Sequence, residues 1–221
     1  MLSVENLHHA HGGTTVLRGV DLVLGRGEIL GLGGASGSGK STLGRLLAGH
    51  LTPLAGRIAL GGAPLPRAAP GRAGPVQYAP QVAELAVDPR WRVGRILSNG
   101  GRPDREACDA LGISDGWRDR YPGELSGGEL ARVSLARLFH PTLCVLVCDE
   151  VTAQLDALEQ AALLDRLIAL ARRRGIALVL VSHSAGLRAR YADRSVTMHG
   201  GRLIGEPEWA RRPRALARWP R

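Results

Sequence analysis

The sequence predicts an α/β protein with a mostly parallel core sheet, an N-terminal antiparallel β part and an inserted helical subdomain. Two observations carry this fold class. Short apolar runs alternate with glycine-rich loops and amphipathic segments, which is the order of a repeated strand–loop–helix unit. Two of the runs, Leu143–Cys148 and Ile176–Val181, are apolar throughout, as expected of parallel strands buried on both faces. A chain of 221 residues is long enough for one such domain, and we expect residues 1–221 to form it.

The first part of the chain predicts β structure followed by one helix. Leu2–Leu32 contains short β-like runs that are interrupted at Gly12-Gly13 and again at Gly25–Gly27. Within this stretch, Glu28–Gly33 predicts a strand that leads into a glycine-rich loop. Lys40–Gly49 then predicts a helix, because its leucines recur on one face.

The middle of the chain has a different composition. Gly56–Pro75 is rich in glycine, proline and alanine, so we expect turns, loops and at most one short strand there. Val82–Tyr121 is polar and helix-prone, and Gly128–Phe139 predicts a further helix. We therefore expect residues 82–140 to form a small helical subdomain.

Regular α/β structure resumes after the helical segment. Ala157–Arg174 predicts a long amphipathic helix, and Gly175 is placed as its C-terminal cap. Ser195–Met198 and Leu203–Gly205 flank a glycine-containing turn and predict a β-hairpin. The last residues, 206–221, form a basic tail.

Composition restricts the class of protein. No continuous apolar run exceeds six residues, far short of the roughly 20 that cross a bilayer, so we expect any membrane role to come through a partner. The N-terminus lacks the pattern of a signal peptide, and three cysteines do not make a disulfide framework; both favour the cytoplasm. The net charge of +9 keeps nucleic acid open as a partner, but the basic residues are scattered rather than clustered.

A phosphate-binding loop is the first chemical motif. Residues 34–41, Gly-Ala-Ser-Gly-Ser-Gly-Lys-Ser, match the pattern G-x-x-x-x-G-K-[S/T]. Glycines let backbone N–H groups turn toward phosphates, Lys40 supplies a compact positive charge, and the Ser41 hydroxyl can coordinate Mg²⁺. Lys40 is the single lysine among 29 basic residues. The nucleotide-binding candidates are Gly34, Ser36, Gly37, Ser38, Gly39, Lys40, Ser41 and Thr42.

Two further motifs separate this chain from other phosphate-loop proteins, such as kinases and GTPases. Leu125-Ser126-Gly127-Gly128-Glu129 is followed about twenty residues later by the buried strand 143–148, which ends in Asp149-Glu150. An acidic pair at the carboxyl end of a buried strand is where an α/β sheet carries its chemistry. The combination resembles the signature and Walker B motifs of ATP-binding cassette (ABC) transporter ATPases, and the resemblance covers nearly the whole chain.

That resemblance implies a role for each matching residue. Asp149, Ser41 and Gln81 would hold Mg²⁺, and Glu150 would be the general base for the attacking water, with Gln81 and the switch residue His183 as further catalytic groups. His11 occupies the position of an aromatic residue that stacks on adenine. Ser126, Gly127, Gly128 and Glu129 would bind the ATP of a second cassette in a head-to-tail dimer, and Asp156 would face that second subunit.

The family also implies partners. Residues 87–94 resemble a segment of peptide and nickel importer ATPases, so we expect an ATP-hydrolysing subunit of such an importer, peripheral on the inner face of the membrane. Its partners would be transmembrane permease subunits, a second ABC ATPase subunit and an extracytoplasmic substrate-binding protein. One alternative is a soluble ABC ATPase that acts on nucleic acid or ribosomes. The positive charge supports it, but such proteins usually carry tandem cassettes, a long coiled coil or a zinc insert, which this sequence lacks, so nucleic acid is not the expected partner. The other alternative is a regulatory cassette that binds ATP without turnover.

Overall fold

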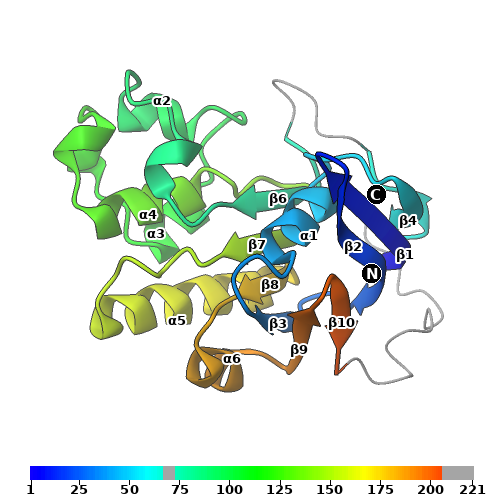
Figure 1. Cartoon of the computed structure of the whole chain (residues 1–221). Helices are drawn as coiled ribbons and strands as arrows, with labels where there is room; N and C mark the ends of the chain where they lie inside the picture. Colours follow the sequence, from blue (N-terminus) through cyan, green and yellow to red (C-terminus); the bar gives the residue numbers. More distant parts are fainter. Residues whose placement is uncertain (67–72, 206–221) are drawn as a thin grey trace.

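The computed structural model describes residues 1–66 and 73–205; the predicted basic tail, 206–221, lies outside the described residues. A six-stranded sheet forms the centre of the molecule, in the order β10-β9-β3-β8-β7-β6 (Figure 1). All its neighbouring strands are parallel except the terminal hairpin β9–β10, as the sequence predicts. The strands are β3 (Ile29–Gly34), β6 (Val76–Ala79), β7 (Val145–Asp149), β8 (Ala177–Val181), β9 (Arg194–His199) and β10 (Arg202–Ile204).

A second, antiparallel sheet is built mainly from the N-terminal region. Its order is β2-β1-β4-β5, from β1 (Leu2–His11), β2 (Thr14–Leu24), β4 (Ala55–Leu60) and β5 (Ala63–Pro64). The six-residue strand β4 exceeds the single short strand expected in the glycine-rich region. It forms because Gly56 has a φ of +88° and a Cβ there would lie 2.2 Å from the Asn6 carbonyl oxygen, so this glycine permits close pairing with β1.

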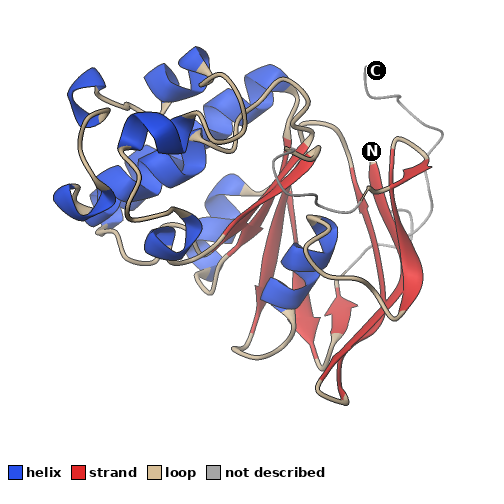
Figure 2. Cartoon of the chain, turned by 90° about the horizontal axis from the view of Figure 1, so that it is seen from above, coloured by secondary structure: helices blue, strands red, loops and turns tan. Residues whose placement is uncertain are grey.

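Helix α1 (Lys40–Leu47) lies between the two sheets, as Figure 2 shows from above. Its leucines Leu43, Leu46 and Leu47 are buried in an apolar cluster with residues of both sheets. Burying each leucine contributes about 2 kcal/mol relative to an exposed side chain. This packing fixes the N-terminal end of α1 directly after the carboxyl end of β3.

Helix α5 (Ala157–Arg174) covers the other face of the large sheet, with the bounds that the sequence predicts. Asp156 accepts hydrogen bonds from the amides of Leu158 and Glu159, both at 2.9 Å, and so caps the N-terminus. Gly175 ends the helix with a φ of +64°, the left-handed conformation that glycine adopts without penalty. Helix α6 (Ala185–Tyr191) was not predicted; it is short, and Ser184 caps it through the Leu187 amide.

All elements between β6 and β7 are helical and gather at one side of the molecule (Figure 1). They bury a shared apolar cluster against α5 and the large sheet. No helix within the described ranges combines the length and apolarity needed to cross a membrane. The helical elements are η1 (Ala83–Ala86), α2 (Val93–Leu97), α3 (Arg105–Ala110), η2 (Asp115–Trp117), η3 (Pro122–Glu124) and α4 (Gly127–Ala136).

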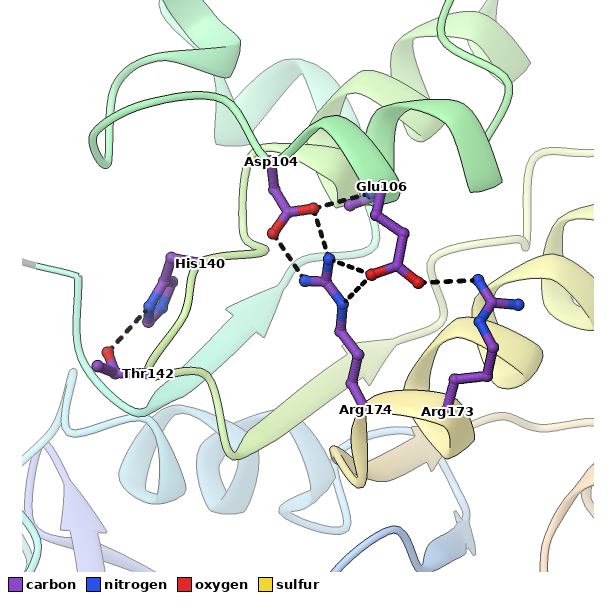
Figure 3. Close-up of polar contacts among 7 residues, drawn as sticks. Asp104, Glu106, His140, Thr142, Arg173 and Arg174 are labelled. Carbon is purple, nitrogen blue, oxygen red and sulfur yellow. Dashed lines mark hydrogen bonds and ion pairs between the residues drawn. The ribbon is translucent and has the colours of Figure 1, made fainter. Parts of the chain in front are cut away.

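An ion-pair cluster ties α3 to the end of α5 (Figure 3). The Arg174 guanidinium donates to both carboxylate oxygens of Asp104, at 2.7 Å each, and to Glu106 Oε2 at 2.6 Å. Asp104 also caps α3 by accepting from the Ala107 amide at 2.8 Å. The hydrogen bonds from Arg174 hold the pKa of Asp104 below its usual value. Arg173 reaches only Glu106, at 3.2 Å, from a more exposed position.

We expect Arg174→Met to destabilise the fold by about 2 kcal/mol, because it leaves a partly buried carboxylate without its bidentate partner. Thermal unfolding measures this loss, and the exposed Arg173→Met is the matched control, with an expected loss under about 0.5 kcal/mol. Because the pKa of Asp104 is depressed in the folded state, the contribution of Arg174 is present at neutral pH and disappears as the pH falls through that pKa. Equal losses in the two variants would contradict the bidentate contact as the cause.

Candidate nucleotide site

The glycine-rich loop joins β3 to α1 and requires glycine at specific positions. Gly34 has a φ of +134°, and a Cβ there would lie 2.4 Å from the Met198 carbonyl oxygen on the neighbouring strand β9. Gly39 has a φ of +111°, and a Cβ would lie 2.9 Å from Leu17 Cδ2. Around Gly37, by contrast, a Cβ would meet nothing within 4 Å. The loop is therefore fixed at both ends, while its middle faces open space that a phosphate can fill.

Two buried polar groups of this loop fit a phosphate ligand. Lys40 is 5% exposed, and its ammonium donates to the carbonyl oxygens of Gly34 at 2.9 Å and Ala35 at 2.8 Å. The Ser38 hydroxyl is buried without a hydrogen-bond partner. A buried hydroxyl without a partner gains from an anionic acceptor, because leaving it unsatisfied costs free energy. The buried ammonium, which donates to two neutral carbonyl oxygens, still lacks a counter-charge, and a phosphate would supply one.

A cavity of about 570 Å³ opens beside the loop and collects most of the predicted residues. It is formed at the carboxyl ends of β3, β8, β7 and β6, which are consecutive in the sheet, so the loops after these strands meet at one edge. Sequence reasoning missed four of its residues, because side chains at the rim carry no motif: His9, Val16, Arg45 and Leu51. The predicted residues that line it are His11, Ser36, Gly37, Gly39, Lys40, Ser41, Thr42, Gln81, Glu150 and His183.

The Glu150 carboxylate lies between the two side chains predicted to act with it. His183 Nε2 is 2.8 Å from one carboxylate oxygen, and Gln81 Nε2 donates to the other at 3.4 Å. Glu150 has a φ of +52°, a left-handed conformation that is uncommon for a residue other than glycine. Its amide donates to the Val181 carbonyl at 3.1 Å, which holds the backbone in this turn. Such conformations concentrate at functional sites, because the surrounding structure must maintain them.

Asp149 is held by a residue that the motifs do not contain. Its carboxylate is 6% exposed and accepts a hydrogen bond of 2.5 Å from the Tyr78 hydroxyl on β6. Burial, together with this hydrogen bond, raises the pKa of Tyr78 to about 12. The carboxylate of Asp149 and the hydroxyl of Ser41 are oxygen groups of the kind that fit Mg²⁺, which proteins bind through one or two carboxylates together with substrate phosphates. Tyr78 could have been found only from the pairing of β6 with β7.

We expect Tyr78→Phe to weaken Mg²⁺ binding roughly tenfold, because hydrogen bonds to a metal-binding carboxylate fix its orientation. Two readouts test this: Mn²⁺ binding to the protein–ADP complex, and the Mg²⁺ dependence of hydrolysis. The KM for ATP at saturating Mg²⁺ should stay unchanged, since phenylalanine fills the same volume. Unchanged metal affinity would mean that the hydroxyl serves packing alone.

The predicted signature residues do not line this cavity. Ser126 caps α4 by accepting from the Glu129 amide at 3.2 Å, and the Glu129 carboxylate accepts from the Ser126 amide at 2.7 Å. This reciprocal pair is a capping box, which glutamate supports as well as glutamine does. Gly127 begins the helix, and a Cβ at Gly128 would lie 3.4 Å from both Leu155 and Glu159. The signature therefore lies beside the start of α5, where Asp156 forms the cap.

The fold and the loop between β3 and α1 define a phosphate-loop nucleoside triphosphatase. A family model described as "ABC transporter" matches residues 17–153. The chain belongs to this family, and it is an ATP-binding and ATP-hydrolysing subunit that energises an ABC transporter.

Three similar proteins are import ATP-binding proteins, one of them putative. The chain is 36% identical to a nickel import ATP-binding protein, NikE, of Pseudomonas putida, over 88% of this chain and 77% of the relative. It is 38% identical to a hemin import ATP-binding protein, HmuV, of Pseudomonas aeruginosa, over 98% and 91%. A putative peptide import ATP-binding protein of Brucella abortus is 35% identical over 89% of this chain, but the match spans only 65% of that relative.

Solved structures show the same architecture. The cbiO1 protein of Clostridium perfringens, part of the ABC transporter complex cbiONQ, superposes with a TM-score of 0.76 at 27% identity, over 92% of this chain and 86% of that one. The ATP-binding cassette MJ0796, in a dimeric post-hydrolysis state with ADP and phosphate, gives a TM-score of 0.78 at 20% identity, over 92% and 96%. The second likeness supports the fold alone.

Proposed function

We propose that this chain hydrolyses ATP at the cavity described above and thereby drives an importer of peptides or of nickel or other metal complexes. The observation that carries the site assignment is the Glu150 carboxylate, placed between His183 and Gln81 at the edge where the phosphate loop opens. In this proposal Lys40 and the loop amides bind the β- and γ-phosphates, and His11 stacks on the base. Mg²⁺, when bound, neutralises phosphate charge.

Glu150 then acts as the general base. Its carboxylate accepts the proton of the attacking water, while Gln81 orients that water and His183 donates toward the γ-phosphate. Ser41 and Asp149, with Gln81, are the proposed Mg²⁺ ligands. Hydrogen bonds at both carboxylate oxygens support this role, because they hold the Glu150 carboxylate in a fixed position beside the site of the attacking water.

A second cassette completes the site in this proposal. Ser126, Gly127, Gly128 and Glu129 lie outside the chain's own cavity, and the signature adjoins the start of α5 near Asp156. Both segments would face a second ABC ATPase subunit, whose nucleotide the signature would contact. Residues 82–140, within the single domain 1–221, are the proposed helical subdomain that meets the permease subunits at the inner face of the membrane. A substrate-binding protein outside the membrane would deliver the cargo.

The import relatives favour transport over action on nucleic acid or ribosomes. The test is uptake by the source cell after deletion of the gene and complementation with wild type or Glu150→Gln. We expect loss of labelled nickel or dipeptide uptake that only the wild type restores. Loss of hemin uptake alone would restrict the cargo to a metal complex other than nickel, and loss of methionine uptake alone would keep the importer and refute the peptide and metal branch. Unchanged uptake of all four would refute the proposed cargo.

A further inference from the structure

A second cavity, of about 330 Å³, lies at the opposite end of β6 from the nucleotide site. It shares no lining residue with the phosphate-loop cavity. β6 begins at this second cavity, whereas Gln81, just beyond the end of β6, lines the first. Its walls come from the residues after α1, α2 and α4, from residues 65–66, and from residues 73–77, which lead into β6. The cavity therefore joins the helical region to the sheet core at a distance from the proposed chemistry.

The walls of this cavity are rich in nitrogen and lack acid. Arg137, His50, His140 and Asn99 contribute to it, and no aspartate or glutamate is among the described lining residues. Asp104, a carboxylate whose charge acts on His140, is already paired with Arg174 (Figure 3).

Arg137 is the one arginine among the described lining residues of this cavity. Its Nε is buried without a hydrogen-bond partner, and no ion pair to it occurs among the described residues. Burial lowers the pKa of the Arg137 guanidinium, which nevertheless stays charged at neutral pH. The carbonyl end of α4, where Arg137 is the cap residue, supplies at most about half an elementary charge. A partly buried cation without a full counter-charge costs free energy, so the site favours an anion.

The two histidines can add hydrogen bonds to such an anion. Burial lowers the pKa of His50, and Arg45 lowers it further. Burial also lowers the pKa of His140, although the Gly74 backbone and Asp104 act in the opposite direction. His140 Nδ1 is 3.1 Å from the Thr142 hydroxyl, and a hydrogen-bonding contact with the Gly74 backbone also acts on the ring. The buried Nε2 makes no hydrogen bond of normal geometry. Neutral imidazoles at these positions offer N–H donors without adding further charge to the cavity.

We propose that this cavity is a binding site for a small multivalent anion, a phosphate or a polycarboxylate, held by the Arg137 guanidinium with hydrogen bonds from His140 and His50. The ligand would contact residues of the helical region and of the sheet core together. Binding would therefore stabilise their relative position without any contact to the nucleotide.

Thermal unfolding with added inorganic phosphate, and separately with citrate, tests the site at constant ionic strength. Every protein in the series carries Lys40→Ala, which removes the positively charged phosphate-binding side chain of the nucleotide loop. In this background either anion should raise Tm along a saturating curve, as expected for a ligand that binds only the folded state. The anion that saturates at lower concentration identifies the ligand chemistry.

Adding Arg137→Met should raise the apparent Kd for the anion at least about tenfold, because a charge-assisted contact is lost. The same substitution should leave Tm without anion unchanged or higher, since it removes a partly buried, unpaired charge. Arg132→Met is the matched control: Arg132 lies on the same helix, also has a buried Nε without a partner, and its guanidinium lies 5.2 Å from the centre of the Trp117 ring. That variant should keep the saturating curve.

The proposal would be overturned if the saturating curve remained unchanged in the variant with Arg137→Met. It would also be overturned if the Lys40→Ala protein itself showed no saturating curve. If Arg137→Met does not fold, His140→Gln decides the question, with an expected rise in Kd of about threefold from the loss of one neutral hydrogen bond. An unchanged Kd in His140→Gln would then overturn the site. None of these outcomes depends on ATP hydrolysis, so failure here is distinguishable from failure of the proposed transport function.

Discussion

Glu150→Gln is expected to reduce the kcat for ATP hydrolysis by about 10²–10⁴-fold while ATP binding persists. The substitution keeps the volume of the side chain and an oxygen that can accept from Gln81, but the amide cannot take a proton from water. Phosphate release measures the turnover, and equilibrium binding of a fluorescent ATP analogue measures affinity. Because ATP would bind without being consumed, gel filtration of this variant in ATP should also show a dimer.

The control for this prediction is Glu5→Gln. Glu5 forms a surface ion pair with Arg57 in the antiparallel sheet, so the same chemical change there should leave turnover intact. Turnover that persists in Glu150→Gln would mean that another group activates the water. Loss of ATP binding in that variant would instead indicate that Glu150 supports the structure of the cavity. A structural role of this kind is consistent with the left-handed backbone of Glu150, which the surrounding residues must maintain. A monomer in ATP would show that a different cassette is the required partner.

Elements with local signals could be predicted closely from the sequence. Helix α5 has a capping aspartate, a continuous apolar face and a C-terminal glycine, and its predicted bounds agree with the structure. Strand β4 has no such signal. Its residues around Gly56 read as a loop, and only long-range pairing with β1 reveals the strand. The short helix α6 was not predicted for a related reason. Its packing against β3 stabilises the helix, whereas its own sequence is too short to show a clear helical periodicity.

The site divides in the same way. Lys40 was predicted from the order and type of residues in one contiguous motif. Glu150 was predicted from an acidic pair at the end of a strand together with the family resemblance, and both residues line one cavity in the structure. Tyr78 was not predicted, because its hydroxyl meets Asp149 only through the register of two strands that lie far apart in the chain. The signature residues were predicted, but one chain alone does not bring them to a nucleotide, so their role stays a prediction that requires the second subunit.

Lys40→Ala is expected to weaken ATP binding about 10–100-fold and to abolish measurable hydrolysis, because it removes a charge-assisted contact to the phosphates. In the structure the ammonium is buried and donates to two loop carbonyls, so it is held in place before any ligand arrives. Isothermal titration with ATP measures the affinity. The structural cost of the change is checked by thermal unfolding without nucleotide, where the loss of the two loop contacts should cost about 1–3 kcal/mol.

Lys40→Arg separates charge from shape at this position. All Lys and Arg positions of the chain except position 40 hold arginine. If positive charge were sufficient at position 40, the protein should tolerate arginine there as well. The loop fits closely around Lys40, which is 5% exposed, and a planar guanidinium has a different shape and a different set of donors from an ammonium. We therefore expect Lys40→Arg to lose hydrolysis nearly as fully as Lys40→Ala. An active Lys40→Arg enzyme would contradict this expectation. The loop would then accommodate either cation, and the structure would not explain why position 40 holds the single lysine.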